Sequence, residues 1–273
     1  MSILIDIAGR DFMLKSIILK LILSTILAMP NTQMIHTDTT NNTIEDHMEE
    51  VINLEIDHNA VLKELGFNKG EYNNLPLDQR NAVLRFQSEH NLTVDGMFGS
   101  QSKGALMKRI MDEEYKYTDV VTYAPSDKHW IAVNKTERIL TLYSGKDVVK
   151  KYPIAQGKDA SLTPEGKFTI VRKTINPSWS YKGKSAKGGA PDNPLGKRWI
   201  GISHGGGGLY GIHGNNDPYS IGTNASLGCV RMINADVEEL FNIIQIDIPI
   251  WIGTHENLIA WGVNQESYFK TTQ

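Results

Sequence analysis

Residues 210–232 read YGIHGNNDPYSIGTNASLGCVRM and contain Cys229, the only cysteine of the chain. His213 lies sixteen positions before it. An imidazole beside a thiol draws off the thiol proton, so such a pair supplies a nucleophile and its base. Glycines flank both residues and leave room for a substrate backbone, and free N–H groups around Cys229 can form an oxyanion hole. The stretch therefore predicts an acyl-transfer site.

For an isolated pair of this kind the alternative is structural, because free cysteine is often only a small buried side chain. The residues around His213 and Cys229 favour a catalytic role. His213-Gly214 followed by Ser226–Met232 resembles the signature of the YkuD-type L,D-transpeptidases, cysteine enzymes that remodel bacterial peptidoglycan. The turn Thr163–Gly166 and the segment Asn176–Trp179 resemble the same family, so the resemblance covers a whole domain and not only its active site.

The resemblance implies Cys229 as the nucleophile, His213 as its base, and a backbone carbonyl near Gly214 that orients the imidazole. The family commonly has histidine where this chain has Leu227. We therefore expect the backbone N–H groups from Leu227 through Gly228 to Cys229, and not the side chain at 227, to hold the oxyanion. Three further residues are expected to contact substrate: Arg231, Ser226 and Tyr210.

Arg231 offers a planar guanidinium that suits a substrate carboxylate. The alternative is an ion pair with Asp236 or Glu238 at the start of the following helix. Residues 166–198 carry eight basic side chains against one acid, Asp192. This segment is either a basic rim that captures the carboxylates of peptidoglycan stems or a solvated loop.

As the family implies, Cys229 attacks the carbonyl of the third residue of a tetrapeptide stem, releases the terminal D-alanine, and passes the acyl group to an amine. The family's sensitivity implies that carbapenems acylate the same thiol. The alternatives are an L,D-carboxypeptidase that uses water as acceptor and a non-catalytic wall-binding protein. No cofactor and no metal are expected, because the eight histidines lie without acidic or thiol neighbours at ligand spacing.

The beginning of the chain predicts export. Residues 1–30 place basic side chains before an apolar run, as in a signal peptide or a membrane anchor, and Met13 is an alternative start to Met1. Residues 31–56 are acidic and predict a solvated spacer. The expected location is periplasmic or extracellular, at the cell wall. The net charge of −3 over 273 residues gives no reason to expect a nucleic-acid partner.

Residues 57–111 predict a domain of three short helices, the third capped by Ser100. Phe86-Gln87 and the loop 91–99, with its Leu-x-Val-Asp-Gly-x-x-Gly pattern, resemble a peptidoglycan-binding module. The alternative is a helical bundle with another role. A binding module of this kind is expected to be separable from turnover on soluble fragments. Residues 112–127 read as a linker.

Residues 128–253 alternate apolar and polar side chains over short segments and predict a mainly β catalytic domain, a YkuD-like β-sandwich. Strands are expected at 199–203, 209–213 and 248–252. A short helix capped by Asn234 is expected after the nucleophile, because Val237, Leu240, Phe241 and Ile244 follow helical spacing. Residues 254–273 form an apolar tail with no assigned role.

Overall fold

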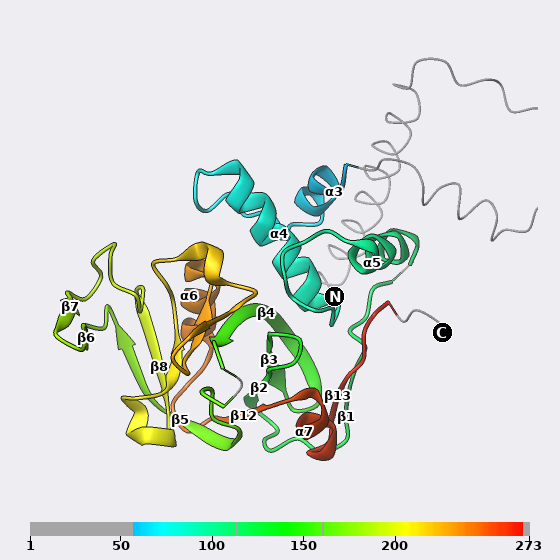
Figure 1. Ribbon diagram of the computed structural model, residues 1–273. Coiled ribbons are helices and arrows are strands. Elements are labelled where there is room, and N and C mark those ends of the chain that lie inside the picture. Colours follow the sequence, from blue (N-terminus) through cyan, green and yellow to red (C-terminus); the bar gives the residue numbers. More distant parts are fainter. Residues whose placement is uncertain (1–56, 113, 160, 270–273) are drawn as a thin grey trace, which may run out of the picture.

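The computed structural model describes residues 57–112, 114–159 and 161–269, and Figure 1 gives its overall arrangement. The predicted signal peptide or anchor and the acidic spacer lie outside these residues. Of the helices in the described part, none has the length and apolar character needed to cross a membrane.

Three helices precede the β-rich part (Figure 1): α3 (His58–Glu64), α4 (Leu75–Glu89) and α5 (Ser100–Met111). The side chain of Asp57 caps α3, and that of Asn74 accepts the N–H of Leu77 at the start of α4. The expectation that Ser100 caps α5 is wrong. Ser100 is already the first helical residue, and Gly99, which has no side chain to offer, occupies the cap position.

The loop between α4 and α5 is organised by Gln87. Its amide nitrogen donates to the carboxylate of Asp95 at 2.8 Å, and its amide oxygen accepts the N–H of Gly96 at 2.9 Å. Gly96 has a φ of +76°, a backbone conformation that suits glycine. The side-chain amide of Gln87 thus links the Phe86-Gln87 and Asp95-Gly96 parts of the sequence pattern.

The remaining chain is mainly β, as expected. The strands are β1 (Asp119–Val121), β2 (His129–Asn134), β3 (Ile139–Ser144), β4 (Asp147–Gly157), β5 (Gly166–Ile175), β6 (Trp179–Tyr181), β7 (Lys184–Ala186), β8 (Arg198–Ile202), β9 (Gly211–His213), β10 (Asn224–Ser226), β11 (Val230–Met232), β12 (Pro249–Gly253) and β13 (Val263–Gln265). Two helices, α6 (Asn234–Ile243) and α7 (His255–Ala260), and two 3₁₀ turns, His204–Gly207 and Pro218–Ser220, complete the fold.

One sheet holds nine of these strands in the order β10-β4-β11-β9-β8-β5-β12-β2-β3, and β3 also pairs with β4. The two long strands, β4 and β5, each belong to both layers of the sandwich. The first part of β4 pairs with β3 and its later residues with β11, while β5 pairs first with β12 and then with β8. Strands β4 and β5 therefore connect the two layers of the expected sandwich. The β6–β7 hairpin projects at the end of the molecule remote from α5 (Figure 1).

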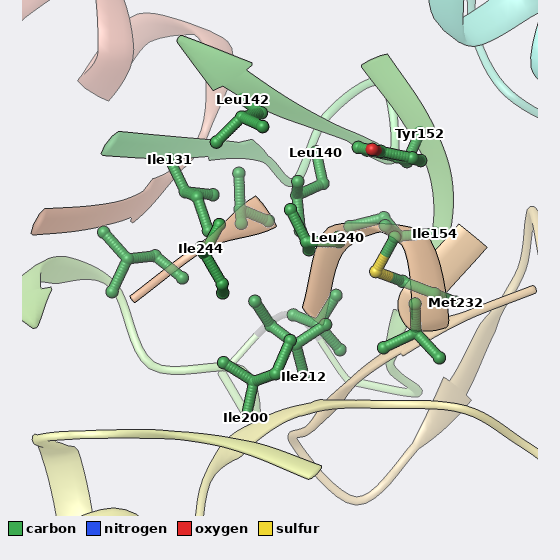
Figure 2. Packing of buried hydrophobic residues seen from close by; sticks show 14 of the residues in the cluster. Ile131, Leu140, Leu142, Tyr152, Ile154, Ile200, Ile212, Met232, Leu240 and Ile244 are labelled. Atoms are coloured by element: carbon green, nitrogen blue, oxygen red, sulfur yellow. The ribbon is translucent and has the colours of Figure 1, made fainter. Parts of the chain in front are cut away.

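Helix α6 packs between the two layers of the sandwich. Leu240 and Ile244 pack among strand residues that include Ile131, Ile200 and Ile212 (Figure 2). The apolar spacing of this segment predicted that contact. The predicted cap is wrong, because Ile233 occupies the cap position and no side chain caps the helix.

The tail after β12 has a structural role that the sequence did not indicate. Strand β13 pairs antiparallel with β1, a strand inside the predicted linker. Beyond it, Tyr268 is buried in the core of the three helices, and its backbone N–H donates to the carbonyl of His90. The tail therefore ties the helical part to the β part.

The helical part and the β part also share a core. Leu84 and Val94 lie in one buried cluster with β-part residues, which are Ile139, Ala155, Ile221 and Ile233. A buried ion pair crosses the same contact, since the guanidinium of Arg85 on α4 lies 3.0 Å from the carboxylate of Asp236 on α6. The expected separability of the helical part does not fit this shared core, because removing it would expose the cluster to water.

Leu84→Ala should destabilise the β part although the change lies on α4. Deleting a fully buried leucine side chain costs about 2–5 kcal/mol of unfolding free energy. All five tryptophans lie at positions 130–261, so tryptophan fluorescence in a urea titration reports the β part alone. Leu75→Ala on the same helix is the matched control, because Leu75 is 65% exposed. An unchanged fluorescence midpoint for Leu84→Ala would mean that the two parts unfold independently.

Candidate active site

Strand pairing brings His213 and the Cys229 turn together. Strands β9 and β11 are parallel neighbours, with Ile212 opposite Val230 and His213 opposite Arg231. His213 is the last residue of β9, and Cys229 comes directly before β11. Parallel neighbours require a crossover of a dozen or more residues, and the sixteen-residue spacing in the sequence provides it.

His213 is held in one orientation. Its Nδ1 donates to the carbonyl of Gly214 at 2.6 Å, because a carbonyl can only accept, and this leaves Nε2 unprotonated as the basic atom. The ring stacks on Trp199 with centroids 5.7 Å apart, and the indole N–H of Trp199 is fixed by the carbonyl of Gly207. Trp199 is a part of the site that the sequence analysis missed.

Burial lowers the pKa of His213 to about 4, with the bond to Gly214 opposing the shift and the charge of Arg231 adding to it. Burial likewise raises the pKa of the Cys229 thiol, opposed by the backbone of Gly211 and by Arg231. Both shifts favour the uncharged forms. Both groups are therefore uncharged at neutral pH, and the Sγ of Cys229 lies 3.7 Å from the carbonyl oxygen of Leu209.

Ser226 shapes the turn that carries Cys229. Its hydroxyl donates to the carbonyl of Cys229 at 2.6 Å and accepts the N–H of Gly228 at 3.0 Å. The residue is only 2% exposed. The expected contact of Ser226 with substrate therefore does not fit, because its hydroxyl is already engaged on both sides and faces the turn.

Gly228 is required at its position. Its φ is +130°, and a Cβ there would lie 2.5 Å from the carbonyl oxygen of Leu162 and 2.9 Å from the ring of Tyr210. Its N–H is already donated to Ser226, which leaves the N–H groups of Leu227 and Cys229 for an oxyanion. The expected use of the Gly228 N–H is thus corrected.

Asn215 and Asn234, which the sequence analysis did not place in the site, hold the backbone that follows His213. The side chain of Asn234 accepts the N–H of Asn215 at 2.9 Å and donates to its carbonyl at 3.0 Å. Asn234 packs so closely that a Cβ on Gly214 would lie 2.3 Å from its Oδ1. The run His213-Gly214-Asn215 could have indicated this contact. Gly214 leaves room for the side chain of Asn234, which bonds to the backbone of Asn215.

The ion pair considered for Arg231 is absent from the described residues. Asp236 pairs with Arg85 and Lys69, and Glu238 pairs with Arg198. The Nε of Arg231 is buried and has no hydrogen-bond partner in the part of the chain that the structure describes. The carboxylate whose charge acts on Arg231 is that of Asp217, and not that of Asp236 or Glu238.

The other expected substrate contacts border the same turn. Tyr210 is half-buried, with its ring beside Gly228 and 4.9 Å from the ring of His204. The side chain of Leu227 is 56% exposed and so does not form part of the core. Of the eight basic side chains at 166–198, Lys167 lies over Trp251, Lys173 donates to the carbonyl of Ile244 at 2.6 Å and Arg198 pairs with Glu238, so these three are committed to the fold.

No group of three or more histidine, cysteine, aspartate or glutamate side chains in the described ranges is arranged to hold a metal ion.

The chain was compared with known proteins. Residues 128–252 match the L,D-transpeptidase catalytic domain of the YkuD family. A putative L,D-transpeptidase of Bacillus subtilis, YqjB, is 42% identical over 130 residues, which cover 47% of this chain and 72% of that protein. The putative L,D-transpeptidase YkuD of Bacillus licheniformis is 44% identical over 116 residues, 42% of this chain and 59% of that protein.

Among solved structures, an L,D-transpeptidase from Xylanimonas cellulosilytica is 20% identical, with a TM-score of 0.46 over 64% of this chain and 80% of that chain. The matched range 128–252 contains the β9–β11 pair with His213 and Cys229, and it spans most of the length of YqjB. The chain therefore belongs to the YkuD family of L,D-transpeptidases.

Proposed function

We propose that the protein is a peptidoglycan L,D-transpeptidase with Cys229 as its nucleophile and His213 as its base. The observation that supports the proposal is the parallel pairing of β9 with β11, because it brings the strand end that carries an oriented imidazole next to the turn that carries the only thiol of the chain. Family membership supports the class of reaction.

In the first half-reaction Nε2 of His213 takes the thiol proton as Sγ of Cys229 attacks the carbonyl of the third stem residue. The oxyanion that forms is held by the N–H groups of Leu227 and Cys229. The intermediate then expels D-alanine, whose amine receives the proton from the imidazolium. The product is a thioester between the stem and Cys229.

In the second half-reaction an acceptor amine attacks the thioester carbonyl and gives its proton to His213. Collapse of this intermediate forms the new amide bond, and the departing sulfur recovers the proton. Because the pair begins uncharged in a buried setting, the thiol becomes nucleophilic only as its proton leaves for the imidazole.

Arg231 and Tyr210 are proposed to contact the stem. Arg231 lies two residues after the nucleophile, its Nε has no hydrogen-bond partner among the described residues, and a guanidinium suits a stem carboxylate. Tyr210 forms the neighbouring wall of the Cys229 turn. If water replaces the amine in the second half-reaction, the same residues make an L,D-carboxypeptidase, and the released product distinguishes the two.

The helical part at 57–111 is proposed to bind peptidoglycan, on the resemblance of its 86–99 pattern to wall-binding modules. The related L,D-transpeptidases act on the cell wall, which fits a periplasmic or extracellular location. Export through residues 1–30, by a cleaved signal or a retained anchor, is part of the same proposal.

Cys229→Ala and His213→Ala should each abolish the stem adduct. Intact-protein mass spectrometry after mixing with a disaccharide-tetrapeptide and an amine acceptor detects the adduct, and the released product identifies the acceptor. A carbapenem should add one drug mass to the wild type and nothing to Cys229→Ala. His129→Ala, on β2, is the matched control and should behave as the wild type. A stem adduct on Cys229→Ala would place the nucleophile elsewhere.

The rate of acylation should stay constant as the pH falls from 7 to 5 and decline around pH 4. The folded-state pKa of His213 is lowered to about 4, so the imidazole remains an unprotonated base until the pH approaches that value. Stopped-flow acylation by a carbapenem measures the profile, with tryptophan fluorescence as the check on folding at each pH. Half-maximal acylation near an ordinary histidine pKa of about 6.5 would show that the imidazole is solvated in the working enzyme.

Leu227→His and Leu227→Ala should acylate at close to the wild-type rate, because this exposed side chain makes no core contact. Leu227→Pro should lose roughly a hundredfold or more, since proline removes an N–H and loss of one oxyanion-hole donor raises the barrier by about 2.7–4 kcal/mol. Circular dichroism checks that the proline variant is folded. A folded Leu227→Ala without activity would mean that the side chain shapes the site.

Met97→Ser should weaken sedimentation of the protein with purified peptidoglycan. Met97 is an exposed apolar side chain on the loop whose pattern resembles wall-binding modules. Both proteins in the assay carry Cys229→Ala, so that no covalent adduct contributes. Met111→Ser is the control, because Met111 is also exposed but lies at the other end of α5. Equal sedimentation of both variants and the parent would exclude the loop as the contact.

A further inference from the structure

The helical part touches the catalytic segment on both sides of the nucleophile. Two arginines of α4 make these contacts, five positions apart and thus on neighbouring turns of the helix. Arg80 reaches the chain that leads to Cys229, and Arg85 reaches the helix that follows it.

The first contact is made to residues 221–222. Nη2 of Arg80 donates to the carbonyl of Ile221 at 2.8 Å. Leu84 packs so closely on the same segment that a Cβ on Gly222 would lie 2.7 Å from its Cδ2. The chain continues from here through β10 into Ser226, whose hydroxyl holds the Cys229 turn. The position of this turn therefore depends on α4.

The second contact is made to α6. The guanidinium of Arg85 holds the carboxylate of Asp236, which is 1% exposed, and Lys69 adds a further ion pair at 3.1 Å. Asp236 lies in the first turn of α6, two residues after Asn234. Asn234 in turn clamps the backbone of Asn215, next to the glycine whose carbonyl orients His213.

We propose that the helical part sets the geometry of the candidate nucleophile and base, with Arg80 and Arg85 as positioning residues. Arg80 acts through the segment that ends in the Cys229 turn. Arg85 acts through Asp236 and Asn234 on the backbone beside His213. This inference rests on the proposed function of Cys229 and His213, and it gives residues 57–111 a role in the reaction in addition to wall binding.

Arg80 is the better residue to test. Removing Arg85 would leave the buried Asp236 and the part-buried Glu71 without their main partner, a change that can unfold the protein. Arg80 donates to a single carbonyl and its replacement leaves no buried carboxylate behind. Arg80→Met keeps most of the side-chain volume, and Arg80→Lys keeps a donor.

The experiment measures two rates on the full chain at pH 7, well below the melting temperature. One is acylation of Cys229 by the disaccharide-tetrapeptide, and the other is alkylation of Cys229 by iodoacetamide. Arg80→Met should slow acylation by about tenfold to a hundredfold, because a small displacement of reacting groups has effects of that size. KM should change by less than about twofold. Alkylation should become faster, since a loosened turn exposes a thiol that is now partly buried.

Arg80→Lys should recover part of the acylation rate. Leu106→Ala is the control for stability, because Leu106 is buried in the helical core and no contact joins it to residues 221–236 among those described. It should lower the melting temperature and leave both rates within about twofold of the wild type.

Wild-type acylation and alkylation by Arg80→Met would overturn the inference, whatever its melting temperature. So would a slowing of acylation by Leu106→Ala equal to that of Arg80→Met, because stability alone would then explain it. If the wild type itself formed no stem adduct, the proposed function would fail, and the alkylation rates would still decide whether Arg80 controls the thiol.

Discussion

The parallel pairing of β9 with β11 is the constraint on which the candidate site depends. Strand β11 also pairs with β4 on its other side, so the residue after the nucleophile begins a strand held along both edges. The connection between β9 and β11 begins after His213 and ends at Cys229. It includes β10, which pairs with β4, and its residues 221–222 pack against α4. A site built this way takes its rigidity from the sheet.

Close packing around His213 and Cys229 affects how their side chains ionise. Gly228 and Gly214 leave space that the backbone of Leu162 and the side chain of Asn234 fill. The same packing keeps water from His213, which lowers its pKa and stabilises the neutral imidazole. The bond from Nδ1 to the carbonyl of Gly214 then fixes which nitrogen acts as the base. Burial thus sets the protonation state of the imidazole, and the hydrogen bond sets its orientation.

The contact between the helical part and the β part makes the two a single body. It combines a shared apolar cluster around Leu84, the buried Arg85–Asp236 ion pair and the tail, whose Tyr268 enters the helical core. Burying a charged pair is unfavourable unless its hydrogen bonds are satisfied, and here Arg85 also binds Glu71 and the carbonyl of Phe67. Such a contact favours one relative placement of the two parts.

The sequence by itself determined the mainly β character of residues 128–253, the apolar face of α6 and the family, because alternation, helical spacing and the run Ser226–Met232 are local patterns. It also pointed to Cys229, the only thiol, as the candidate nucleophile and, through the family resemblance, to His213 as the candidate base. The tertiary structure alone decided that Ser226 faces the turn, that Trp199 stacks on the imidazole while Asn234 holds the backbone of Asn215, and that α4 joins the catalytic segment. These are contacts between residues far apart in the chain, and a hydroxyl or an amide has no preferred partner until the fold brings one within hydrogen-bond distance.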